Sequence, residues 1–165
     1  MQNAKDTFYI TLRDRVAALN PARTIVLRGQ TRPGVLVEEN ELASAFDQQD
    51  AFRLRWTTLA IDSQQPAPLA ALRCEILYAT AGSSGNGGMD RGRLLEAMDA
   101  ELFSALHTAP QNALLQQFAS DTAAVVLPAR IFWGNPAFNP VTSNGELLER
   151  TATVDVFTYQ NQEER

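Results

Sequence analysis

Cysteine, histidine and lysine are almost absent from this chain. Cys74, His107 and Lys5 are the only residues of their types among 165. One cysteine excludes an intramolecular disulfide, and one histidine excludes a metal site built from several His or Cys ligands, such as a zinc finger or an H-E-x-x-H enzyme. Cys74 lies on the apolar side of a predicted strand, so we expect it to be a small buried side chain.

Runs of positive charge are also missing. The formal charge is −5 and the isoelectric point about 4.9, which argues against specific binding to nucleic acid. No stretch approaches 18 consecutive apolar residues, and residues 1–6 open no signal peptide. We therefore expect folding in the cytoplasm and no membrane partner.

What is present is typical of one globular domain spanning residues 1–165. The composition is 45% hydrophobic and 20% charged, within the ordinary range. The central stretch is the most informative. Residues 72–78 alternate apolar and polar side chains as a strand does, the glycine-rich segment 81–88 follows, and 90–107 has helical periodicity. The predicted buried stripe of this helix consists of Leu94, Leu95, Met98, Leu102, Ala105 and Leu106.

Earlier in the chain, residues 4–19 predict a helix that ends at Asn20-Pro21. Residues 24–27 and 35–38 predict two strands of a hairpin. Residues 52–61 alternate with a change of phase across Thr57-Thr58, which predicts a strand with a β-bulge, antiparallel to the strand that ends at residue 80.

The remaining segments read less regularly. Residues 38–50 predict an exposed acidic connection with a short helical turn, and 112–118 predict a short helix. Residues 125–133 are extended, and Pro128 places them at a sheet edge or outside the ladder. Residues 134–145 form an irregular excursion, and 151–159 a final strand. The fold class is therefore α+β, a single mostly antiparallel sheet packed by an N-terminal helix and one main central helix.

The glycine-rich segment invites a phosphate-binding interpretation, because a helix N-terminus offers free N–H groups. Neither G-x-x-x-x-G-K-[ST] nor G-x-G-x-x-G occurs there. Ser83 and Ser84 lack the G-x-S-x-G elbow, and His107 is predicted at the far end of an 18-residue helix, where it bonds the last helix carbonyls or lies in water. The segment is predicted to be an exposed loop, either a contact for a partner or a simple connection.

Two further groups are candidates for contacts. Arg91 and Arg93 put positive charge into the first helical turn, where the helix dipole disfavours it. They either lie against Asp90 or in water, or they reach an acidic group on another subunit. Among the aromatic residues, Trp56 is predicted in the core, and a group of three at an edge or subunit contact. That group is Phe132, Trp133 and Phe138.

In this order of elements the chain resembles phage tail terminator proteins, the tail-completion class that includes the minor tail protein U type. The likeness spans most of the chain. The segments that carry it are 8–19 with Leu12-Arg13-Asp14-Arg15, 72–76 leading into 81–85, 89–95, and 151–156.

The resemblance implies a subunit of a homo-oligomeric ring, a hexamer in this family, that caps the tail tube of a phage or phage-tail-like particle and joins it to the head or neck. Its implied partners are the tail tube protein and a head/neck connector or sheath protein, first in the host cytoplasm and then in the virion tail. No cofactor, metal or catalytic residue comes with that role. The long 133–144 excursion leaves a different connector, neck or sheath-contacting role open. The predicted interface residues are Gly82, Ser83, Ser84, Gly85, Arg91, Arg93, Trp133 and Phe138.

The alternative function is a small cytoplasmic ligand-binding or enzymatic α+β domain that uses Gly82–Gly88 as an anion site.

Overall fold

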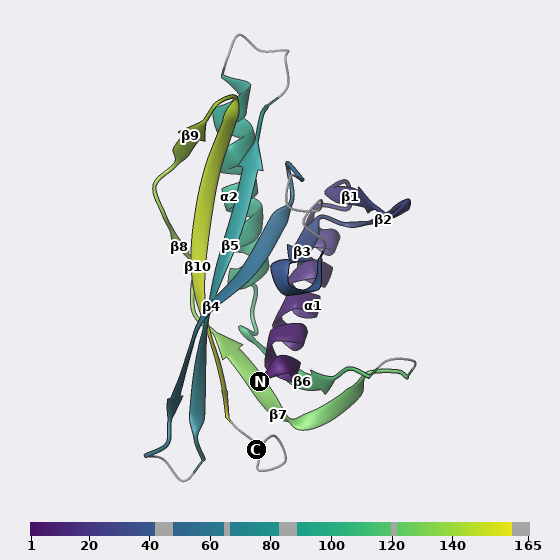
Figure 1. The fold of residues 1–165 in the computed structure, drawn as a ribbon, viewed down its shortest axis with the longest axis vertical. Coiled ribbons are helices and arrows are strands. Elements are labelled where there is room, and N and C mark those ends of the chain that lie inside the picture. Colours follow the sequence, from purple (N-terminus) through teal and green to yellow (C-terminus); the bar gives the residue numbers. More distant parts are fainter. Residues whose placement is uncertain (42–47, 65–66, 83–88, 120–121, 160–165) are drawn as a thin grey trace.

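The chain forms a curled, mostly antiparallel sheet with two long helices against one of its faces (Figure 1). This structure is a computed structural model that describes residues 1–41, 48–64, 67–82, 89–119 and 122–159. The predicted α+β class is confirmed.

The helices are α1 (Gln2–Leu19) and α2 (Asp90–His107), with a short 3₁₀ helix η1 (Glu38–Asn40). The strands are β1 (Thr24–Leu27), β2 (Gln30–Pro33), β3 (Val35–Val37), β4 (Phe52–Asp62), β5 (Leu69–Thr80), β6 (Asn112–Gln117), β7 (Val125–Trp133), β8 (Ala137–Phe138), β9 (Thr142–Asn144) and β10 (Leu147–Tyr159). The main sheet has the order β3-β4-β5-β10-β7-β6, with β8 and β9 also paired to β10, and β1-β2 form a separate hairpin.

The pairing of β5 with β10 forms the centre of the sheet. The two strands are antiparallel over their whole common length, from Leu148 opposite Thr80 to Tyr159 opposite Leu69. Alternate side chains face the helices, and on β10 they are buried at every second position from Ala152 to Thr158. Antiparallel pairing of β4 with β5 is confirmed, as is the β-bulge, because the register shifts between Trp56 and Thr58. The bulge lets both Trp56 and Leu59 lie on the helix-facing side.

The two long predicted helices are confirmed, with one difference in the buried stripe of α2. In α1, Phe8, Leu12 and Val16 are buried, and the backbone N–H of Asn20 closes the last turn. In α2 the stripe holds five of the six predicted residues, but Leu94 is 40% exposed. Leu94 lies at the margin of the stripe, about 70° from its centre on a helical wheel. Its side chain therefore points away from the sheet more than those of the other five residues.

The predicted hairpin between 24–27 and 35–38 is wrong. Arg28 and Gly29 both have positive φ, 51° and 76°, which makes a tight turn that pairs β1 with β2 instead. The three residues of β3 are all buried, and they pair with the start of β4 in parallel. A continuous apolar triplet suits a strand that is covered on both faces.

The predicted helix over 112–118 is also wrong, since residues 112–117 form β6. Leu and Gln favour helix locally, but the ladder with β7 overrides that preference. β7 itself lies between β6 and β10, and Pro128 falls where the β6–β7 register shifts. The missing N–H of proline thus coincides with an irregular part of the ladder.

The helices are shorter than the sheet is long. An α-helix of 18 residues spans about 27 Å, whereas a strand of 13 residues spans about 43 Å. Figure 1 shows the consequence: near the start of α2 the helix and sheet end together, and at the other end β4 and β5 continue beyond both helices. Part of the sheet is therefore not covered by helix.

Candidate functional site

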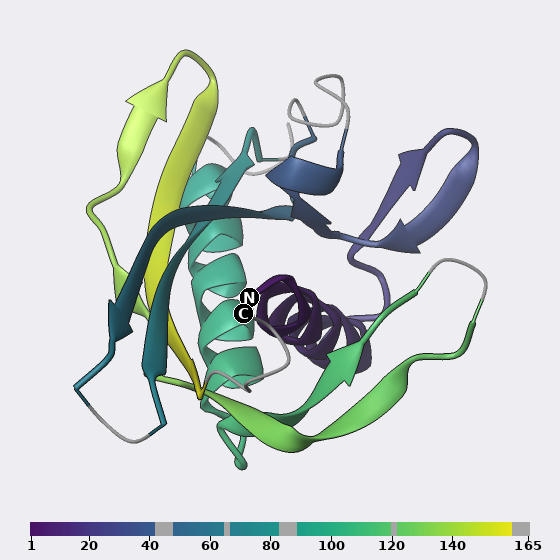
Figure 2. The same ribbon diagram turned by 60° about the horizontal axis from the view of Figure 1, so that its bottom comes forward.

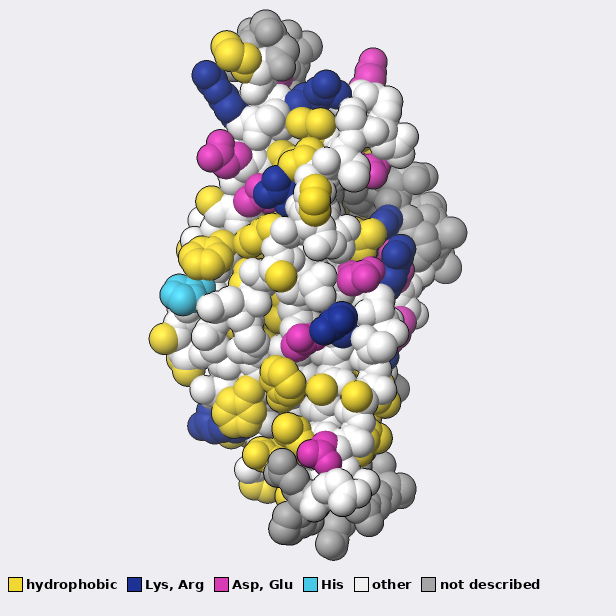
Figure 3. Space-filling model, turned by 90° about the vertical axis from the view of Figure 1, so that its left-hand side faces the viewer, with side chains coloured by type: hydrophobic (Ala, Val, Ile, Leu, Met, Phe, Trp, Pro, Cys, Tyr) yellow, Lys and Arg dark blue, Asp and Glu magenta, His cyan; other side chains and the backbone are white. Residues whose placement is uncertain are grey.

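The sheet face that points away from the helices, called the outer face here, has an apolar end. Side chains from four neighbouring strands form one row across it, because Ala60, Ala71, Phe157 and Phe132 are consecutive partners in the ladder. Leu69 and Tyr159 pair in the adjacent row. Phe132 is 40% and Tyr159 46% exposed. We call these six residues the outer patch, and Figure 3 shows hydrophobic side chains gathered over the lower part of this face.

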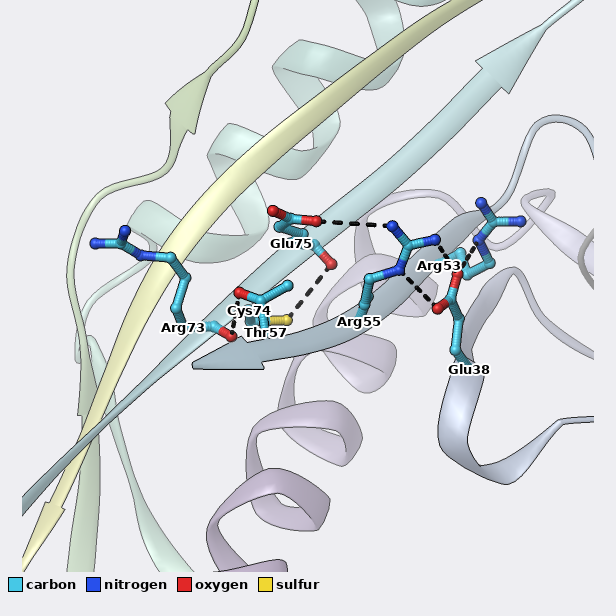
Figure 4. A network of polar contacts seen from close by, with 7 residues as sticks. All are labelled: Glu38, Arg53, Arg55, Thr57, Arg73, Cys74 and Glu75. Atoms are coloured by element: carbon cyan, nitrogen blue, oxygen red, sulfur yellow. Dashed lines mark hydrogen bonds and ion pairs between the residues drawn. The ribbon is translucent and has the colours of Figure 1, made fainter. Parts of the chain in front are cut away.

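A band of charges crosses the outer face next to this patch (Figure 4). Glu38 of η1 accepts from Arg55 at 2.8 Å and forms an ion pair with Arg53 at 2.9 Å. A hydrogen bond from Arg55, more than its charge, lowers the pKa of the Glu38 carboxyl below its ordinary value. Arg73 likewise pairs with Asp155 of β10 at 2.9 Å. With Glu75, 3.9 Å from Arg55, these charges are matched within the subunit, and partly exposed pairs of this kind contribute little to stability.

Beyond the band lies a groove of about 820 Å³, open to solvent. One wall is the 139–144 segment with β9, the opposite wall is the 48–53 segment, and the floor includes Leu77, Ala79 and Thr151 of β5 and β10. Gly82, the one described residue of the Gly82–Gly88 loop, does not line it.

Two strand segments have an open side among the described residues. β4 pairs with β3 only through Phe52–Leu54, so the segment Thr57–Asp62 is bonded to β5 alone. β7 pairs with β10 only at 131–133, so Val125–Arg130 faces β6 alone. Both carry exposed apolar side chains: Leu59 and Ile61 are 51% and 48% exposed, and Val125 and Val126 are 56% and 57% exposed. We call them the β4 edge and the β7 edge.

The start of α2 fixes Gly82 and Arg91 inside the subunit. Gly82 has a φ of 76°, and a Cβ added there would lie 2.6 Å from Cγ of Arg91, so only glycine fits. Arg91 donates through Nη1 to the backbone oxygen of Glu146 at 2.6 Å, which ties α2 to the turn before β10. Arg93 is exposed. The other loop candidates, Ser83, Ser84 and Gly85, lie outside the described residues.

The aromatic candidates separate into core and surface. Trp133, predicted at an edge or subunit contact, is 5% exposed and donates from Nε1 to Leu106 O at 2.9 Å, so it belongs to the core of the subunit. Phe138 is half-buried against that core, opposite Ala152. Trp56, predicted in the core, lies at its margin against Phe8. Of the predicted contact group, Phe132 is the exposed member.

Three partly buried polar clusters hold the elements together, and sequence reasoning missed all of them. Arg15 donates to the backbone oxygens of residues 105, 108 and 110 and stacks on Trp133, so it caps the end of α2. Arg23 pairs with Glu101 at 2.7 Å. The carboxylate of Asp99 accepts from Tyr78 and, at 2.6 Å, from Arg150. Each cluster joins residues at least 21 positions apart, and no local pattern signals such partners.

Cys74 and His107, the residues considered for catalysis or metal binding, lie among contacts that stabilise the fold. Cys74 is buried, and burial raises the pKa of its thiol, as expected for a small core residue. His107 is exposed at the end of α2 and stacks on Phe103, and its Nδ1 lies 3.2 Å from Oδ1 of Asn135. The last helix carbonyls are held by other side chains: Arg15 bonds Ala105 O, and Trp133 bonds Leu106 O. Within the described ranges there is no cluster of three or more His, Cys, Asp or Glu able to hold a metal ion.

Neither helix of the described chain is long and apolar enough to cross a membrane. The chain matches no protein-family model, and a search of curated proteins finds no match.

Proposed function

We propose that this protein is a structural subunit of a phage tail or phage-tail-like particle. Copies associate into a ring that caps the tail tube and joins it to the head or neck. The observation that carries the proposal is the pair of unlike open edges, on β4 and on β7, each with exposed apolar side chains. The order of elements, which resembles that of tail terminators, supports the particular role.

Unlike edges favour a ring over a two-fold dimer. A two-fold interface brings the same patch of both copies together, whereas contact between different patches repeats from copy to copy and closes into a ring when the rotation permits. Figure 2 shows that the β4–β5 end and the β6–β7 end point to opposite sides of the molecule. Each copy can therefore contact one neighbour on each side. The six-fold number comes from the family resemblance alone.

The native mass of the purified protein tests the proposal. We expect a closed oligomer of one defined size by light scattering and native mass spectrometry, and binding of that oligomer to the end of a tail tube assembled from the cognate tube protein. Leu59→Asp should weaken association at least tenfold, the equivalent of about 1.4 kcal/mol, because it places a charge on the β4 edge. Leu19→Asp, at a side chain 50% exposed on α1, is the matched control and should associate normally.

A protein that stays monomeric up to high concentration, alone and with tube protein, would contradict the proposal. So would a ring that forms but never binds a tube, which would leave self-association intact and remove the tail role.

The groove on the outer face favours a second candidate, a small ligand-binding α+β domain. Its 820 Å³ is within the usual range of small-molecule sites, and it combines an apolar floor with polar walls. Thermal unfolding with a panel of nucleotides and phosphorylated metabolites separates the two candidates, because a ligand that binds only the folded state raises Tm. A clear rise for one compound would support the ligand-binding domain, and the anion site at Gly82–Gly88 is tested by the same panel.

A further inference from the structure

The β4 edge and the β7 edge are complementary to each other. Both segments, Thr57–Asp62 and Val125–Arg130, are continuous strand with one ladder side open among the described residues. An open edge presents backbone N–H and C=O groups that pair readily with another strand, and in the β7 edge Pro128 contributes only its C=O. Each segment is rich in apolar side chains that stay exposed in the subunit.

Their charges are opposite. Thr57–Asp62 contains one acidic residue, Asp62, and no basic one, whereas Val125–Arg130 contains one basic residue, Arg130, and no acidic one. Both charged side chains are exposed and bond to neutral groups: Asp62 accepts from the N–H of Gln64, and Arg130 donates to Asn112. Aligned end to end in parallel, a β4 edge beside a β7 edge puts Asp62 opposite Arg130, whereas two β4 edges or two β7 edges put like charges opposite each other. In antiparallel alignment the two charges lie at opposite ends of the contact.

The edges cannot satisfy each other within one copy. In the main sheet β5 and β10 lie between β4 and β7, and Figure 2 shows the free ends of the two strands on opposite sides of the molecule. In the part of the chain that the structure describes, no segment of the same copy completes either edge, and another copy can supply the complementary one.

We infer that the β4 edge of one copy pairs strand to strand with the β7 edge of the next, so that the sheets of neighbouring subunits join into one continuous sheet around the ring. This inference rests on the proposed ring, and it names the surfaces that close it. The paired edges also bring the outer patch of one subunit, which includes Ala60 of β4, next to the β6–β7 arm of its neighbour. The backbone hydrogen bonds between the two edges orient one subunit relative to the next, and the apolar side chains of both edges become buried in the contact.

Engineered cysteines test the pairing, since native Cys74 is buried and is the only other thiol. If the segments align end to end, antiparallel pairing puts Ile61 opposite Val126, and parallel pairing puts it opposite Ala129. Two double variants cover both directions: Ile61→Cys with Val126→Cys, and Ile61→Cys with Ala129→Cys. After mild oxidation, one of them should give a non-reducing ladder of cross-linked multimers that ends at the ring size.

The controls carry one thiol or a misplaced pair. Ile61→Cys alone and Val126→Cys alone should give no cross-linked dimer, because contact between unlike edges never brings the same residue of two copies together. Ile61→Cys with Ala100→Cys, which places the second thiol on the exposed side of α2, should also give none.

The outcomes distinguish this inference from the function it rests on. A ring of normal mass in which neither double variant forms cross-links overturns the edge pairing and leaves the ring. A cross-linked dimer from Ile61→Cys alone overturns it in favour of a two-fold contact. No association at all overturns both.

Hydrogen exchange of the unmodified protein is the second measurement, free of any effect of substitutions on folding. Amides of 57–62 and 125–130 should exchange at least tenfold more slowly in the assembled ring than in the diluted monomer. Amides of β10 at 152–156, already within the sheet, should change little. Unchanged exchange at both edges on assembly overturns the inference.

Discussion

The two halves of β4 have the same sequence pattern and opposite environments. In the first half, Phe52 and Leu54 face the helices and are fully buried. In the second half, Leu59 and Ile61 continue the same side of the strand after the bulge and are about half exposed, at 51% and 48%. The first half of β4 packs against α1 and pairs with β3. The second half extends past the ends of both helices (Figure 1).

This difference teaches that alternation marks a side of a strand and not its burial. Whether an inward-facing side chain is covered depends on how far the helices reach along the sheet. The uncovered half is the part of this strand free to meet another molecule, and for that reason our functional proposal rests on it.

The comparison is tested most strongly by matched truncations in the two halves. Leu54→Ala should lower the free energy of unfolding by about 2–5 kcal/mol, because it removes a fully buried side chain and leaves a cavity. Leu59→Ala should change it by no more than about 0.5 kcal/mol. Urea denaturation at a concentration where the protein is monomeric measures both, and similar losses for the two variants would contradict the distinction.

A second pair of substitutions contrasts a glycine packed against the start of α2, Gly82, with an open glycine within α2, Gly92. Gly82→Ala should destabilise by about 1–3 kcal/mol, since alanine is strained at a φ of 76° and its Cβ would meet Arg91. Gly92→Ala is the control: no atom lies within 4 Å of its added Cβ, and alanine should stabilise the helix by up to about 1 kcal/mol. Thermal unfolding gives the sign of each, and a neutral Gly82→Ala would remove the structural role of that glycine.

The smallest expected effect concerns Glu38, which bridges Arg53 and Arg55 where β4 leaves the covered region. Its folded pKa is held below the ordinary 4.5 by the hydrogen bond from Arg55, so its stabilisation is present above that value and is lost as the pH falls through the folded pKa. Glu38→Gln should cost about 0.5 kcal/mol or less at pH 7, with a difference that vanishes under acidic conditions. Denaturation curves at several pH values measure it, and a difference that grows toward low pH would reverse the assignment.

Much of the fold followed from local patterns in the sequence. The two long helices, the bulged strand β4 and the strands β5 and β10 were all predicted, because their side chains repeat with a clear period over many residues. The errors fall on short segments. The predicted hairpin of 24–27 with 35–38 was wrong because a two-residue turn at Arg28-Gly29 pairs β1 with β2 instead. The predicted helix over 112–118 was wrong because pairing with β7 outweighed the helical composition of the segment.

The candidate interface was less predictable than the fold. The aromatic cluster around Trp133 looked like a surface group, yet Trp133 is held in the core by Phe8, Arg15 and a backbone oxygen of α2, all distant in sequence. Of the two open edges, only the one on 125–133 was anticipated, from Pro128; the β4 edge was not predicted, since an edge is defined by the strands that fail to pair beside it.

The sequence by itself determined the two long helices and the apolar side of the long strands β4, β5 and β10, because these follow from the period of neighbouring residues. Only the tertiary structure decided which apolar positions are covered. Two helices of about 27 Å cannot span strands of about 36–43 Å, and the length by which the sheet exceeds them is set by how the helices are placed across it.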